Sequence, residues 1–257
     1  MSGNRWVLGV AGAVLALVLQ AAPASAQATR TWVSGVGDDI NPCSRTAPCK
    51  TFAGAITKTA TGGEISVLDP GGFGTINITK SISIVARGTE GSILGSLVNG
   101  VIINAPATSI VHLEGLNIEG ATNGLNGVRI LAGGQITIQD CTIRGFQAAA
   151  PNGFGIIYLA ATAVSRLEVV DTVITANRGG ISIAAPGANT NAAVFNRVAI
   201  NNQTGGIGIS VTGATSSLTL MDSLVQGSIT TASGGQVFSF GNNALFSGSP
   251  TSTVPLQ

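Results

Sequence analysis

Charge, aromatic rings and histidine are all scarce in this 257-residue chain. Charged residues make up 9% of it, against about 25% in a typical soluble domain, and aromatic residues only 4%. The 12 basic and 11 acidic residues nearly cancel, which disfavours nucleic acid or an anionic membrane surface as the main partner. His112 is the only histidine, and no second cysteine shares a face with Cys141. We therefore expect neither a metal site nor a bound cofactor.

What the chain does contain is a repeat. A six-residue phrase with an apolar residue at each end returns five times, and successive copies start 25, 31, 26 and 25 residues apart. The copies are Leu113–Ile118, Ile138–Ile143, Val169–Ile174, Phe195–Ile200 and Leu220–Val225. A fixed period of this size is typical of a stacked solenoid, in which each repeat contacts only its neighbours.

Apolar and polar residues alternate within each phrase, and the alternation breaks once, at the third residue. This pattern predicts two short, half-buried strands joined by a bend. A further strand in each coil follows a glycine, such as Gly127 or Gly155, and we expect this glycine to permit a tight turn. Because the strands favour Ile, Val and Thr and no repeat has a convincing helical stretch, a leucine-rich repeat is excluded. The prediction is an all-β chain that forms a parallel β-helix of about seven coils.

The N-terminus has the pattern of a secretion signal. Arg5 precedes an apolar run from Trp6 to Leu19, and Ala24-Ser25-Ala26 matches a signal peptidase site. The apolar run is shorter than the roughly 20 residues that a membrane-spanning helix needs. We predict cleavage before Gln27, a secreted protein in the periplasm or outside the cell, and no membrane insertion after cleavage.

The segment after the signal peptide should close the first coil. An oxidising location favours a disulfide between Cys43 and Cys49, which lie in a Pro-flanked loop. A short amphipathic helix at roughly 50–60 would direct Phe52 and Ile56 into the core. The predicted organisation is a signal peptide (1–26), an opening strand with the disulfide loop and capping helix (27–63), the parallel β-helix (64–246) and a C-terminal tail (247–257).

Residues 31 to 86 resemble a known group of proteins. The run reads W-V-S-x-x-G-D-D-x-N-P, then P-C-K-T-F-x-x-A-I, E-I-x-V-L-x-P-G and I-T-K-S-I-S-I. It is similar to the N-terminal segment of secreted bacterial right-handed parallel β-helix proteins of the pectin-lyase-like superfamily. This resemblance implies a single-stranded right-handed parallel β-helix with a short N-terminal capping helix. The superfamily contains polysaccharide lyases, hydrolases and esterases, but also many members without demonstrated chemistry, so likeness of fold alone confers no activity.

The best polar constellation is the third residue of the phrase. Along the stack it reads Gly115, Asp140, Asp171, Arg197 and Asp222. As a site, Asp140 and Asp171 could bind a cation or share a proton, and Arg197 could bind a uronate carboxylate or act as a base. As structure, short polar residues would form a bend, and their charges would compensate one another. We favour the structural interpretation, because one residue per coil is too few for a cation site.

Other polar residues give weaker signals. We expect His112 to be an exposed surface histidine, and Asp38-Asp39 to form a turn. Four residues on neighbouring coils could form a shallow charged patch: Glu114, Glu119, Arg129 and Arg144. Of the superfamily's active-site patterns, the coils have no Asp-Asp pair, no glycine after His112, which the resemblance would imply for a hydrolase, and no acidic calcium cluster, which it would imply for a lyase. Trp32 is expected to belong to the N-terminal cap, which leaves few aromatic rings to stack on sugars.

Three hypotheses for function follow. The first is a secreted, non-catalytic β-helix that binds carbohydrate, a cell surface or a protein partner, and is a monomer. The second is a calcium-dependent lyase acting on uronic-acid polymers, with Asp140, Asp171 and Arg197 as its site. The third is a structural, envelope-associated protein. The absence of a recognisable catalytic group favours the first and leaves enzymatic activity open.

Overall fold

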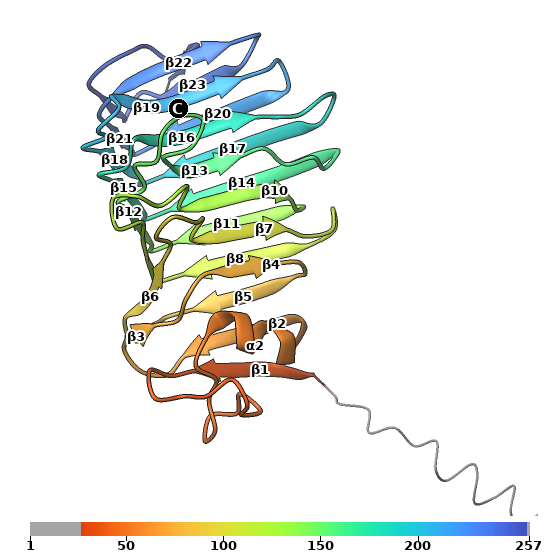
Figure 1. The fold of residues 1–257 in the computed structure, drawn as a ribbon. Helices are drawn as coiled ribbons and strands as arrows, with labels where there is room; N and C mark the ends of the chain where they lie inside the picture. The colour runs from red at the N-terminus through yellow and green to blue at the C-terminus, as the bar shows by residue number, and fades with distance from the viewer. Residues whose placement is uncertain (1–26, 256–257) are drawn as a thin grey trace, which may run out of the picture.

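The computed structural model describes residues 27–255, so the predicted signal peptide lies outside the described residues. The strands wind into a rod of stacked coils, along which three parallel sheets run (Figure 1). Within residues 27–255, no helix is long and apolar enough to cross a membrane.

The three sheets are named here by number, with strands given in chain order. Sheet 1 has ten strands: β1 Ala28–Val33, β2 Thr59–Val67, β5 Ile82–Val85, β8 Ile110–Glu114, β11 Gln135–Gln139, β14 Val164–Val170, β17 Thr190–Asn196, β20 Ser216–Met221, β23 Gln236–Phe240 and β25 Ser252–Val254. Sheet 2 has seven: β4 Ile76–Ile78, β7 Val101–Asn104, β10 Val128–Ala132, β13 Phe154–Tyr158, β16 Gly179–Ala184, β19 Ile207–Thr212 and β22 Ser228–Ala232. Sheet 3 has eight: β3 Gly71–Gly72, β6 Gly91–Leu94, β9 Leu116–Glu119, β12 Thr142–Arg144, β15 Val173–Thr175, β18 Ala199–Asn201, β21 Leu224–Val225 and β24 Ala244–Leu245.

Each coil passes through sheet 2, sheet 1 and sheet 3 in that order. Seven complete coils follow one another, from β4-β5-β6 to β22-β23-β24. Strands β1 to β3 precede them, and β25 adds one more strand to sheet 1 by pairing with β23. The predicted parallel β-helix of about seven coils is therefore confirmed.

The core is a stack of equivalent side chains. Leu113, Ile138, Val169, Phe195 and Leu220 occupy matching places in adjacent strands of sheet 1, and all are fully buried. Each such side chain stabilises the fold by about 1.5–3 kcal/mol through burial. Every coil repeats this arrangement, so apolar burial stabilises the fold along its whole length. The protein therefore does not depend on many charged residues for stability.

The glycines before the sheet 2 strands have a different role from the predicted one. Positive φ angles, which a tight left-handed turn would require, are found at Gly206 but not at Gly100, Gly127, Gly155 or Gly180. At those four a Cβ would instead collide with an isoleucine methyl of the same coil, and it would also crowd the next coil; on Gly127, for example, it would clash with Ile143 and with the carbonyl oxygen of Gly155. These glycines are therefore required by close packing within a coil and between coils rather than by backbone conformation.

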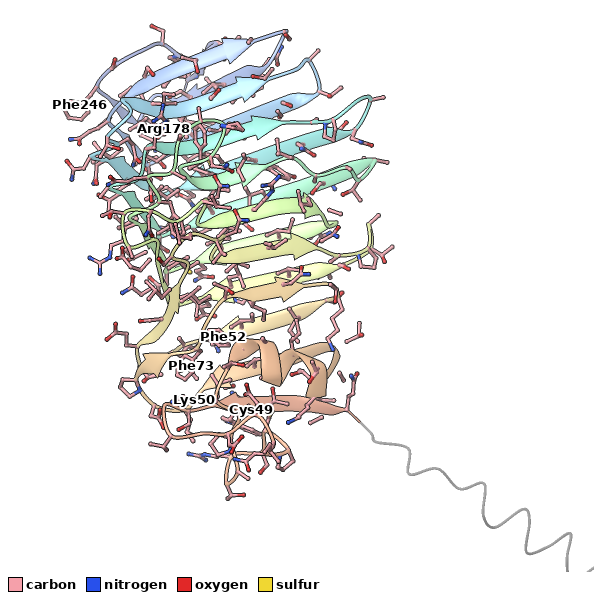
Figure 2. The ribbon with its side chains drawn as sticks, in the orientation of Figure 1. Cys49, Lys50, Phe52, Phe73, Arg178 and Phe246 are labelled. Carbon is pink, nitrogen blue, oxygen red and sulfur yellow. A yellow bond between two sulfur atoms is a disulfide. The ribbon has the colours of Figure 1, made fainter. Side chains whose placement is uncertain are left out.

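A helix closes the N-terminal end of the rod, as predicted. Helix α2 (Phe52–Lys58) begins at Thr51, whose side chain accepts a hydrogen bond from the Gly54 N–H. Phe52 is fully buried. Its ring centroid lies 5.3 Å from that of Phe73, which follows β3 at the start of the β-helix (Figure 2). The predicted disulfide joins Cys43 to Cys49 in the loop that precedes α2.

The C-terminal tail packs against the last coil. Gly248 lies close to the Ile229 backbone of β22, and the Thr251 N–H donates to the Val237 carbonyl at 2.7 Å. The predicted domain boundaries remain predictions. Strand β2 begins at Thr59, before the predicted start of the β-helix at residue 64, and β25 lies in the predicted C-terminal tail.

Candidate functional site

The predicted polar column lies at the bend between sheets 1 and 3. Gly115, Asp140, Asp171, Arg197 and Asp222 all have left-handed backbones, with φ of 71°, 55°, 50°, 53° and 47°. Such a conformation is easiest for glycine and next easiest for Asn and Asp. The column therefore forms the repeated bend of the coil, which explains why short polar residues recur there.

Two of the four charged residues in this column, Asp171 and Arg197, pair with each other. Arg197 donates to both oxygens of Asp171, at 2.6 and 2.8 Å, and these hydrogen bonds lower the pKa of Asp171 and raise that of Arg197. The Asp222 carboxylate accepts a hydrogen bond from Asn242. Asp140 is exposed, and its side chain makes no hydrogen bond or ion pair with any described residue.

The column does not fit a calcium ion. In the part of the chain that the structure describes, no three side chains of His, Cys, Asp or Glu are grouped so that they could hold a metal ion. Calcium requires six to eight converging oxygen ligands, whereas Asp171 is already bonded to Arg197. A role for Asp140, Asp171 and Arg197 in binding or chemistry remains a hypothesis.

The predicted charged patch is not formed. Arg144 and Glu119 do pair, with Nε and Oε2 2.5 Å apart, and they lie on sheet 3. Glu114, however, lies on sheet 1 and Arg129 on sheet 2, so the four residues occupy three different faces. The prediction was wrong because sequence spacing gives the coil of each residue but not the sheet from which its side chain projects.

A different cluster lies at the N-terminal end of sheet 1. A hollow of about 370 Å³ opens there, and we call it the arginine hollow. Its lining comprises Arg30, Trp32, Arg45, Ser66, Val67, Leu68, Val85 and Arg87. Three of these residues are basic and none is acidic. The hollow therefore presents three guanidinium groups together with an indole ring.

The floor of the arginine hollow is ordered by an ion pair and hydrogen bonds. Arg30 pairs with Glu64 on the next strand at 2.8 Å and donates from Nε to the Ser66 hydroxyl at 3.0 Å. The Arg30 guanidinium also lies over the Trp32 ring, 5.6 Å from its centroid, which is within cation–π range. Trp32 thus lies on the outer face of β1, where its half-buried ring can contact a ligand.

Arg87 connects the arginine hollow to a second set of charged and polar groups, Glu114 and His112. The Arg87 guanidinium donates to both oxygens of Glu114, at 2.5 and 2.7 Å, and His112 Nε2 lies 2.9 Å from the same carboxylate. The hydrogen bonds from Arg87 lower the pKa of Glu114, although burial opposes the shift, and the bond with His112 lowers it further. His112 is therefore a partner of a buried carboxylate, with 26% of its side chain exposed, and not the freely exposed histidine that we predicted.

Arg45 contributes the uncompensated charge. It comes from the loop between the two disulfide cysteines, and it makes no ion pair or side-chain hydrogen bond with any described residue. Backbone hydrogen bonds tie the same loop to β1, from the Trp32 N–H to Cys43 O and from the Cys49 N–H to Trp32 O. The disulfide loop therefore holds a cationic side chain over the outer face of the first strand.

Sequence reasoning missed this cluster. Arg30, Arg45 and Arg87 come from β1, the disulfide loop and the segment after β5, and nothing in their spacing relates them. One signal was available: Arg30 and Trp32 are two residues apart on a predicted strand, so their side chains share a face. The sequence therefore indicated that Arg30 and Trp32 share the outward face of β1. It did not indicate that Arg45 and Arg87 lie beside them.

Comparisons with known proteins agree with the architecture. No protein-family model matches the chain, and no curated protein matches it either. The solved structure of pectate lyase Pel9A is similar, with a TM-score of 0.58 and 13% identity, covering 92% of this chain and 82% of the lyase. At this identity the likeness shows the fold alone, a parallel β-helix of the pectin-lyase-like type.

Proposed function

We propose that this chain is a secreted protein that binds an acidic polysaccharide, without cleaving it, in the arginine hollow. The observation that carries the proposal is the convergence of Arg30, Arg45 and Arg87 around one indole ring, with no acidic residue in the lining. Arg45 makes no ion pair with any described residue, and Arg30 and Arg87 keep N–H groups beyond those bonded to Glu64 and Glu114. Guanidinium groups bind carboxylates through paired, charge-assisted hydrogen bonds. A ring such as that of Trp32 offers an apolar surface with a polar edge, which suits a sugar face.

The volume and location of the hollow support a ligand of this kind. Its volume of about 370 Å³ falls within the roughly 300–1,000 Å³ typical of small-molecule sites. It opens on a rigid sheet, and the Cys43–Cys49 disulfide fastens the loop that carries Arg45. Disulfides persist in oxidising compartments, which supports a location outside the cytoplasm.

Binding of a hexamer of galacturonic acid, measured by calorimetry, tests the proposal. We expect Arg45→Ala and Arg87→Ala each to weaken binding roughly ten- to hundredfold, which corresponds to a charge-assisted hydrogen bond of about 1.5–3 kcal/mol. Arg178→Ala is the matched control, because Arg178 is an exposed arginine in a later coil, away from the hollow (Figure 2). Affinity should also fall as salt is added.

Two outcomes would contradict this function. One is binding of a neutral galactose hexamer as tight as that of the acidic one. The other is an equal loss of affinity in Arg45→Ala and Arg178→Ala. In either case the arginine hollow would not be the site that selects the ligand.

A second candidate function is eliminative cleavage of the same polymers, and the contact between His112 and Glu114 beside Arg87 favours it. Arginines in the hollow would neutralise the uronate carboxylate, and His112 would remove the proton from the adjacent carbon. The electron pair released forms a C=C bond, the bond to the leaving sugar oxygen breaks, and that oxygen takes a proton from water. Glu114 would orient the imidazole through its contact with Nε2.

Cleavage would generate an unsaturated uronide that absorbs in the ultraviolet. If this candidate holds, product forms with the native chain, and His112→Gln abolishes it while hexamer binding persists. Binding without product across a panel of uronic-acid polymers, with and without added calcium, would leave the binding function alone. Light scattering separates both from the envelope-associated assembly, since we expect a monomer.

A further inference from the structure

A larger hollow adjoins the arginine hollow on the other side of Arg30 and Trp32. We call it the cap hollow; its volume is about 690 Å³, and it is lined by Gln27, Ala28, Arg30, Trp32, Ile40, Asn41, Pro42, Ser44, Thr57 and Lys58. Arg30 and Trp32 line both hollows. The two therefore meet at a shared wall, in which the Arg30 guanidinium lies over the Trp32 ring.

The cap hollow has a different chemistry. Lys58 is its only basic residue besides Arg30. The Lys58 ammonium group donates hydrogen bonds to the carbonyl oxygens of Asp39 and Asn41. The remaining lining is neutral, and Ile40 is 90% exposed. This surface suits the hydroxyl groups and apolar faces of a sugar chain better than its carboxylates.

A third hollow lies farther along sheet 1, and we call it the distal hollow. Its volume is about 390 Å³, and Gln135, Ile136, Thr137, Arg166, Leu167, Glu168, Ala192 and Val194 line it. It shares no residue with the arginine hollow, and strand β8 lies between them. A ligand that ran along the stack would have to pass over the outer face of β8, whose residues line neither of these two hollows.

We propose that the bound acidic polysaccharide crosses the Arg30–Trp32 wall and continues into the cap hollow, around the N-terminal edge of the rod. This inference rests on the proposed binding function. It assigns a carboxylate-bearing segment to the arginine hollow and an adjoining segment, recognised by its hydroxyl groups and ring faces, to the cap hollow. The direction is then across the first strand and not along the stack of coils.

Binding of galacturonic acid oligomers of increasing length, from two to eight residues, tests the direction. Ala28→Trp fills the cap hollow, and Ala192→Trp fills the distal hollow; both replace an alanine on an outward face of sheet 1. We expect affinity to rise at least tenfold with length in the native chain. Ala28→Trp should reduce long oligomers to the affinity of short ones, and Ala192→Trp should change nothing.

Ser44→Trp fills the cap hollow from the loop and should reproduce Ala28→Trp, which guards against a local folding defect in either variant. The inference is overturned if Ala192→Trp removes the gain with length, or if long oligomers bind both cap-hollow variants as tightly as the native chain. The proposed function is overturned instead if the native chain binds no oligomer of any length, or if Arg45→Ala binds oligomers of every length as tightly as the native chain. The two failures are therefore distinguishable.

Discussion

Replacing Asp39 should loosen the cap that carries Arg45. The Asp39 carboxylate accepts three hydrogen bonds, from the Lys50 N–H at 2.8 Å, the Thr51 N–H at 2.9 Å and the Thr51 hydroxyl at 2.7 Å. It thereby joins the turn after β1 to Thr51, the residue that caps the N-terminus of α2. Asp39→Ala leaves these donors without their acceptor, and the helix loses its anchor to the loop.

The expected cost is about 3 kcal/mol of unfolding free energy at pH 7, since hydrogen bonds to a charged group are worth about 1.5–3 kcal/mol each and partial exposure lowers their sum. Burial would raise the pKa of Asp39, but the hydrogen bonds from Thr51 and Lys50 outweigh it, so the pKa is lowered. A carboxyl with a lowered folded-state pKa stabilises fully above its unfolded pKa of about 3.9. The difference between native chain and variant should therefore shrink as pH falls below about 4.

Gly54 provides an independent check of the same contact. Glycine to alanine within a helix normally stabilises it by about 1 kcal/mol, but a Cβ here would collide with the Asp39 carboxylate. Gly54→Ala should thus destabilise the native chain and stabilise the Asp39→Ala variant.

Urea unfolding followed by circular dichroism and by Trp32 fluorescence measures these differences. Asp38→Ala is the matched control: Asp38 is exposed and its carboxylate accepts one hydrogen bond, from the Ile40 N–H at 3.0 Å, so the effect should stay within about 0.5 kcal/mol. Equal losses in Asp38→Ala and Asp39→Ala, or a stabilising Gly54→Ala in the native chain, would refute the reasoning.

Three further predictions concern the coils. At the bend, Asp140→Val should lower the unfolding free energy by about 1–2 kcal/mol, because a left-handed backbone disfavours branched side chains. Asp140→Gly should not lower it, since Gly115 fills the equivalent place in another coil. Urea titration of the two variants measures the difference. Burial raises the pKa of the Cys141 thiol to about 12, so a thiol reagent at pH 8 should label Cys141 in urea but not in the folded chain. Gly127→Val should cost about 3 kcal/mol through overpacking against Ile143 of the same coil and the Gly155 carbonyl of the next, and a native-like melting temperature would count against this close packing.

The architecture was predictable because one short pattern decides it many times over. Burial requires the apolar ends of each phrase to face inward, and parallel stacking then places Leu113 over Ile138 and Ile138 over Val169. Each coil provides the same information independently, so an irregular coil, such as the one that contains the 31-residue interval, does not obscure the period. The cap helix followed from the need to cover the open end.

The polar sites were far less predictable. A repeated phrase fixes the order of residues along one edge, so the bend column was found, but not that Asp171 and Arg197 would neutralise each other. Glu114 was placed in the correct coil and assigned the wrong neighbours, because its partner Arg87 lies outside any repeat.

The sequence by itself determined the coil, its period and the inward side chains, since local alternation and hydrophobic burial act within one repeat and its neighbours. It also indicated the disulfide, because Cys43 and Cys49 are close together in a chain predicted to be exported. Only the tertiary structure decided where Arg30, Arg45 and Arg87 meet, because a strand, a loop and a turn brought them together. Charged side chains on an outer face are not constrained by the core. Their meeting depends on the path of the N-terminal loop over the first strand, which no repeat encodes.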